Sequence, residues 1–252
     1  NACARKCKRQ RKTNGSRASN EDGEVRGVQG CENPAKCYNV ITIYLMDKQM
    51  STNAYDPRRA WLRATIYFVV CFMIAHFTGA LALVLNQPLA SAEDLRDVRW
   101  VLFTLLCVAV EVWGYVYLWP RGTLTHGRQL YWSVVLTFGL VWGLSEGLLF
   151  LSVFVLASKF IVSKIMVWLV SFTIISMFLG LWHQFYWDIY VAPEHNILEW
   201  NIKKVLYGHI PNIVITLTYL SVYGNAGIFV LCQTFALVAS TYFMRFPPFW
   251  SE

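Results

Sequence analysis

The sequence predicts an all-α protein, a polytopic membrane bundle of about six transmembrane helices. Apolar residues make up 56% of the chain and charged residues only 15%, whereas a soluble domain carries about 25% charged residues. Aromatic residues reach 16%, with 11 tryptophans, which is typical of proteins that have aromatic belts at the membrane interfaces. Several apolar runs also reach the length of about 20 residues that a helix needs to cross the bilayer core.

Four apolar runs are long enough to span a membrane, namely 61–85, 100–119, 130–157 and 160–182. The next apolar segment, 210–243, would be about 50 Å long as one helix, which is too long for a single crossing. The sequence Tyr-Gly-Asn-Ala-Gly at 223–227 is a turn signal. We therefore predict helices at 209–222 and 226–244, the first of them short and partly re-entrant. This gives six spans, or five if the last pair is counted as one.

Residues 193–208 predict one further helix, amphipathic and lying on the membrane interface. Pro193 lies near its start, Lys203 and Lys204 lie in its last turn, and Gly208 lies just past its end. These are the positions at which such residues favour helix initiation and termination.

The N-terminal region differs from the rest of the chain in composition. Residues 5–12 hold six Lys or Arg, and polar sequence without apolar periodicity follows. Such a segment buries too little apolar surface to offset its ordering entropy, so we expect 1–49 to be disordered and 50–252 to form the transmembrane domain. A second interpretation is that 1–49 is upstream translated sequence outside the native protein, because Met50 resembles an ordinary start.

Basic residues in short loops predict which side of the membrane each loop occupies. With six spans, most of them fall on one side, and both termini are then expected to be cytoplasmic. Lys159 and Lys164, in a tight turn on the other side, argue against this orientation. The residues that favour it are Arg58, Arg59, Arg63, Arg121, Arg128, Lys203, Lys204 and Arg245.

The densest group of polar side chains lies around the predicted cytoplasmic ends of spans four and five. We interpret His183, His195, Glu199 and His209 as candidate metal ligands, since a mixed His/carboxylate set suits non-haem iron or zinc; haem is also left open. His195 and Glu199 are four residues apart, so they share one helix face. The alternative is an ordinary interfacial loop whose polar side chains face water and lipid headgroups.

Glu146 and Glu111 lie inside predicted spans, where ionisable groups are costly and are therefore candidate functional residues. A carboxylic acid that stays neutral in lipid can protonate an olefin or epoxide, and a second carboxylate can accept the proton. We therefore take Glu146 and Glu111 as candidate catalytic groups, together with Asp188 from the polar group near the cytoplasmic end of span four. The alternative is that each buried Glu hydrogen-bonds to a neighbouring helix and has a structural role.

Three glycines, Gly139, Gly143 and Gly147, repeat every four residues along the third span. Glycine at this spacing lets another helix backbone approach closely. The third span is therefore expected at the packed centre of the bundle, with Glu146 against protein rather than lipid.

These features favour a membrane-embedded enzyme acting on a terpenoid, sterol or fatty chain. It would be a metal-dependent oxidoreductase or an acid–base isomerase or cyclase. The alternative is a non-catalytic accessory subunit or small permease, in which the same groups stabilise contacts or pass protons. The expected partners are membrane lipids and, for an accessory subunit, another membrane subunit; no nucleic acid is expected.

Overall fold

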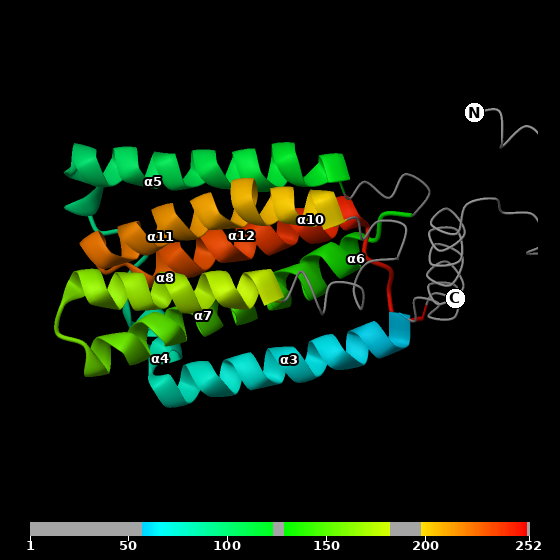
Figure 1. Ribbon diagram of the computed structural model, residues 1–252, viewed down its shortest axis with the longest axis horizontal. Helices are drawn as coiled ribbons and strands as arrows, with labels where there is room; N and C mark the ends of the chain where they lie inside the picture. The colour runs from blue at the N-terminus through cyan, green and yellow to red at the C-terminus, as the bar shows by residue number, and fades with distance from the viewer. Residues whose placement is uncertain (1–56, 123–128, 182–197, 251–252) are drawn as a thin grey trace, which may run out of the picture. The chain divides into compact units, whose positions relative to one another are not determined.

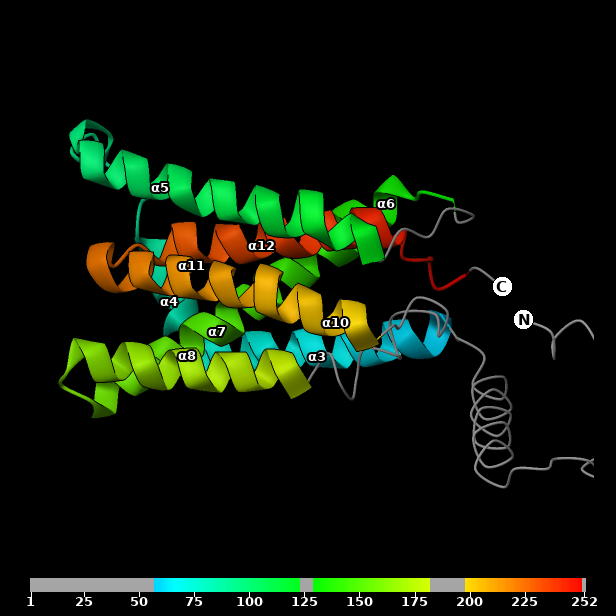
Figure 2. The ribbon, with the colours of Figure 1, turned by 45° about the horizontal axis from the view of Figure 1, so that its top comes forward.

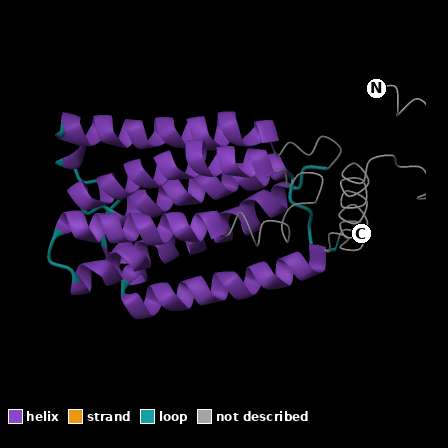
Figure 3. Cartoon of the chain, in the orientation of Figure 1, coloured by secondary structure: helices purple, strands orange, loops and turns teal. Residues whose placement is uncertain are grey.

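The computed structural model describes residues 57–122, 129–181 and 198–250, all within one compact unit of residues 53–252. Every regular element in these ranges is a helix (Figure 3). The prediction of an all-α membrane bundle with six transmembrane helices is confirmed, and the chain is an integral membrane protein. Spans one to six are Arg58–Thr78, Val98–Arg121, Trp132–Phe160, Lys164–Leu181, Ile202–Tyr223 and Ala226–Met244. The predicted disordered segment 1–49 lies outside the described residues.

Successive spans run in opposite directions (Figures 1 and 2). The end of the bundle where span one begins and span six ends is called the terminal end below. The opposite end, which carries the tight connections between spans three and four and between spans five and six, is called the turn end. Spans two, four and six therefore begin at the turn end, and spans one, three and five begin at the terminal end.

Span one is shorter than the apolar run 61–85 predicts. Helix α3 covers Pro57–Thr78 and ends at Gly79, whose φ of 88° is in the left-handed region. A separate helix, α4 (Ala80–Asn86), follows and packs against spans three and six. The chain therefore bends at a glycine where the sequence pattern shows only continuous apolar residues.

Span two begins at the turn end with a capped helix. In α5 (Val98–Glu111) the Asp97 side chain accepts a hydrogen bond of 2.9 Å from the backbone N–H of Arg99, which satisfies one of the free donors of the first turn. The helix widens into the π-helical segment η2 (Val112–Leu118) and ends in the 3₁₀ segment η3 (Trp119–Gly122).

Spans three and six form the centre of the bundle. Span three comprises α6 (Trp132–Val134), the π-helical η4 (Val135–Gly139) and α7 (Leu140–Phe160). It packs along α12 (Ala226–Met244). This helix is the most deeply buried of the six spans, since 67% of its most apolar 18-residue stretch is buried. Span four, α8 (Lys164–Leu181), packs on the outside of this pair against α7 and α11.

The glycine ladder explains the close approach of spans three and six, and the prediction made from it is confirmed. A Cβ added to Gly143 would lie 2.5 Å from the Thr234 Cα, and one added to Gly139 would lie 3.0 Å from the Thr241 Oγ1. Gly147 faces Gln233 and Val230 of the same helix. Glycine at these positions leaves the room that the facing backbone of α12 occupies.

Span five differs from the two predictions made for this region, which were a separate interfacial helix at 193–208 and a short, partly re-entrant helix at 209–222. Helix α10 (Leu198–Lys204) runs without a break through the π-helical η7 (Val205–His209) into α11 (Ile210–Tyr223), so Gly208 lies inside a helix rather than past its end. The resulting span is full-length, not short and re-entrant. The predicted turn after it is confirmed: Gly224 is left-handed with a φ of 67°, and Asn225 caps α12.

Candidate functional site

A close crossing of spans two and five brings the main polar cluster together. Gly114 of η2 faces Gly208 of η7, and a Cβ added to Gly114 would lie 3.4 Å from the Gly208 Cα. Because neither residue has a side chain, the two π-helical segments pack backbone to backbone. Their neighbours Tyr115 and His209 are thereby placed in contact. Gly208 has a packing role here that its position in the sequence does not suggest.

Five buried side chains from spans two, five and six form a hydrogen-bonded network. The Tyr115 hydroxyl and the His209 Nδ1 are 2.6 Å apart, and the Asn212 Nδ2 donates to the same hydroxyl over 3.3 Å. Asn212 and Gln233 pair through both amide groups, at 3.4 Å each, and the Gln233 Nε2 donates to the Thr216 Oγ1 over 3.2 Å. Since the Tyr115 oxygen accepts from Asn212, its own proton can be donated to His209.

The network continues toward the terminal end through aromatic and cationic side chains. The Trp119 ring lies 5.3 Å from the His209 ring, edge to face, and the Lys204 Nζ lies 4.9 Å from the Trp119 ring centroid. Lys204 is fully buried despite its charge. A cation over an indole face is stabilised by the ring's electrons, more strongly when it is removed from water.

Glu111 lies one helical turn before Tyr115 in span two and is only 2% exposed. Neither of its carboxyl oxygens has a hydrogen-bond partner among the described residues. Buried polar groups are almost always hydrogen-bonded, so a buried carboxyl without a partner calls for a functional explanation.

Glu146 lies at the midpoint of span three and is 4% exposed. Its Oε2 accepts hydrogen bonds from the Trp142 Nε1 over 3.0 Å and from the Tyr67 hydroxyl over 3.5 Å. The expectation that Glu146 faces protein rather than lipid is confirmed. The two carboxyl groups thus differ: Glu146 is held by two donors, and Glu111 is held by none of the described residues.

The predicted metal ligands fall into two groups. His183 and His195, together with the catalytic candidate Asp188, lie outside the described residues. Glu199 is exposed on α10 and forms an ion pair with Lys203 over 2.5 Å, and this hydrogen bond lowers the pKa of Glu199. His209, in contrast, is buried and bonded to Tyr115. These two candidates therefore have separate surroundings, one in solvent and one in the core.

The metal hypothesis gains no support from the part of the chain that the structure describes. Residues 57–122, 129–181 and 198–250 contain no group of three or more His, Cys, Asp or Glu side chains that could hold a metal ion.

The sequence interpretation missed the residues that link the ionisable groups. It considered His, Asp and Glu, and passed over Tyr115, Asn212 and Gln233, which are neutral. A signal for them was available: amides inside apolar spans are rare enough to indicate a contact between helices. The close contact of Gly114 with Gly208 had no comparable signal, because single glycines in separate spans do not show which of them meet.

Comparison with known protein families, curated proteins and solved structures found no match to this chain.

Proposed function

We propose that this integral membrane protein is a small permease that passes protons, with Glu111 as the central proton-exchanging group. The observation that carries the proposal is the buried carboxyl of Glu111 at mid-span, which has no hydrogen-bond partner among the described residues. A carboxyl in this position takes up and releases a proton without first breaking a hydrogen bond. Intramembrane carboxyl groups of this kind are characteristic of proton relays.

The surroundings of Glu111 support a route toward the terminal end. Tyr115 and His209 are hydrogen-bonded to each other. The hydroxyl of the first and the imidazole of the second can each donate or accept a proton. Lys204 and Trp119 follow beyond His209. The contacts among these four side chains therefore extend from Tyr115, one helical turn after Glu111, toward the terminal end of the bundle.

The proposal includes the orientation with both termini in the cytoplasm. Among the described residues, the terminal end carries seven basic side chains and one acidic one, Glu199. The turn end carries four basic and three acidic side chains, so its net charge is far smaller. The positive-inside rule then assigns the terminal end to the cytoplasm. The basic residues of the terminal end are Arg58, Arg59, Arg63, Arg121, Lys203, Lys204 and Arg245.

Proton flux into liposomes tests this function directly. Purified protein is reconstituted with a pH-sensitive dye inside, and a potassium gradient with valinomycin drives proton entry. Wild-type protein should acidify the lumen faster than protein-free liposomes, and Glu111→Gln should remove the difference. Glu93→Gln, an exposed carboxyl in the loop before span two, is the matched control and should behave as wild type. Flux that is unchanged in Glu111→Gln, or absent in the wild type, would overturn the proposal.

A second candidate function is acid–base catalysis on a lipophilic substrate such as a terpenoid, sterol or fatty chain. The observation that favours it is the position of Glu146, whose carboxyl accepts hydrogen bonds from Trp142 and Tyr67. The aromatic rings beside this carboxyl can stabilise a cationic intermediate. This function predicts that an organic extract of the purified protein contains a lipophilic compound that accumulates in a different chemical form in Glu146→Gln. Mass spectrometry of the two extracts measures this, and identical extracts would contradict it.

A further inference from the structure

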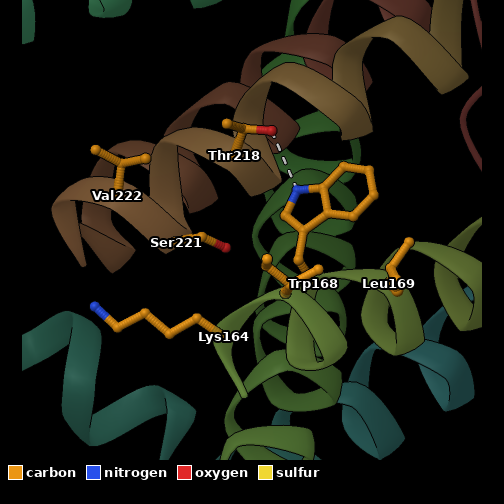
Figure 4. Close-up of a pocket in the computed structure, with 7 residues that line it drawn as sticks. Lys164, Trp168, Leu169, Thr218, Ser221 and Val222 are labelled. Atoms are coloured by element: carbon orange, nitrogen blue, oxygen red, sulfur yellow. Dashed lines mark hydrogen bonds between the residues drawn. The ribbon is translucent and has the colours of Figure 1, made fainter.

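A groove on the lipid-facing surface lies between spans four and five at the turn end. Its volume is about 460 Å³, and side chains of α8 and α11 line it (Figure 4). Lys164 and Val222 lie at its outer end. Trp168 lies about 6 Å deeper along α8, at 1.5 Å of rise per residue. Its indole Nε1 donates to the Thr218 hydroxyl over 3.1 Å, which closes the inner wall of the groove.

Two polar groups of the groove have no partner in the described parts of the chain. Lys164 is exposed at the first residue of α8, and no described side chain forms an ion pair with its ammonium group. The Ser221 hydroxyl is buried and makes no hydrogen bond within the described residues. Some span hydroxyls, such as those of Ser152 and Thr218, donate to the carbonyl four residues back. Ser221 does not, and it shares this with Ser171, Ser176 and Ser240 among the described residues, but it is the one that lines the groove. In Figure 4 the Ser221 hydroxyl points from α11 toward α8.

We propose that this groove is a binding site for an anionic phospholipid. The order of groups along the groove matches the order of groups in the lipid. The Lys164 ammonium faces the phosphate, the Ser221 hydroxyl donates to an ester carbonyl just below it, and Ile165 and Trp168 pack against the first acyl methylenes. Lipid already surrounds this face of the bundle in a bilayer, so charge complementarity at Lys164 favours an anionic headgroup over a zwitterionic one. In the proposed orientation the turn end is not cytoplasmic, so the lipid is an anionic phospholipid of the non-cytoplasmic leaflet.

Lipid retention measured by native mass spectrometry tests the site. Purified protein is exchanged into detergent with equal amounts of phosphatidylglycerol and phosphatidylcholine, and the bound lipid is counted. The wild type should retain phosphatidylglycerol preferentially. Lys164→Gln should reduce that preference about fivefold, the factor expected for one lysine near an anionic headgroup. Ser221→Ala should weaken retention of both lipids, because both carry the ester carbonyl.

The matched control is Lys159→Gln. Lys159 lies at the same end of the bundle, but its Nζ already donates to the Thr78 carbonyl over 2.9 Å, so its removal should leave the lipid preference unchanged. Equal retention of the two lipids by the wild type would overturn the proposal, as would a Lys164→Gln protein that behaves like Lys159→Gln. The binding measurement needs no proton flux, so its result is independent of the proposed permease function.

Discussion

Replacing Gly143 by alanine tests whether the contact between spans three and six determines the stability of the bundle. The added Cβ would lie 2.5 Å from the Thr234 Cα and 2.8 Å from the Thr234 carbonyl oxygen. The first distance is about 1 Å short of the 3.4 Å at which ordinary contact begins. Since both atoms are backbone, a rotamer change cannot relieve the clash, and α7 must move away from α12.

The size of the effect follows from two opposing contributions. Overpacking of a well-packed core costs about 1–3 kcal/mol, and here the displaced helices are the two at the centre of the bundle. Alanine in place of glycine returns up to about 1 kcal/mol through helix propensity. We therefore expect Gly143→Ala to lower the free energy of unfolding by about 1–2 kcal/mol.

The control for this substitution is Gly180→Ala. Gly180 lies in α8, and a Cβ placed there meets no atom within 4 Å. Gly180→Ala therefore causes no clash and should only stabilise the helix, through the higher helix propensity of alanine. Reversible unfolding in mixed micelles, followed by circular dichroism, compares the two variants with the wild type. If Gly143→Ala proves as stable as Gly180→Ala, spans three and six are not held at the distance described here, and the argument from the glycine ladder fails.

Three further predictions concern the polar groups of the bundle. Asn212→Leu leaves Gln233 without its amide partner and should lower the free energy of unfolding by about 1–3 kcal/mol, measured in the same micelles. Tyr115→Phe removes the hydroxyl that contacts His209 and should slow liposome proton flux while leaving the circular dichroism spectrum unchanged. Asp94 accepts hydrogen bonds from the Ser91 backbone N–H and hydroxyl, which lower its pKa. The stabilisation from Asp94 is therefore present above the normal carboxyl pKa and is lost as the pH falls through the lowered value. Acidification should then lower the protection factor of the Ser91 amide, which is its exchange rate relative to the unfolded chain at the same pH. Asp94→Asn should remove the pH dependence of that protection factor.

The features predictable from the sequence were those that depend on local composition. Span existence follows from apolar length, because the bilayer core fixes how many residues a crossing needs. The break before Ala226 follows from Gly224 and Asn225, whose backbone preferences act within a few residues. The burial of Glu146 follows from the glycines at 143 and 147, since their spacing indicates which face of the span is packed.

The features that were not predictable depend on which spans become neighbours. Gly208 is equally suited to end a helix and to admit another backbone, and only the position of Gly114 shows that it does the second. The π-helical segments η2, η4 and η7 were likewise not predicted from the composition of their spans. Tyr115, Asn212 and Gln233 join into one network only once spans two, five and six are adjacent.

The positions of these segments connect the fold to the proposed function. Both close contacts of the bundle combine glycines with π-helical segments: Gly139 of η4 faces α12, and Gly114 of η2 faces Gly208 of η7. Only the second contact also carries ionisable groups, and π-helical turns are frequent at functional sites. Glu111 lies immediately before η2, and His209 is the last residue of η7. A register shift in either segment would change the distance between Tyr115 and His209. The candidate proton-exchanging groups therefore lie beside the one π-helical contact of the described bundle that joins two such segments.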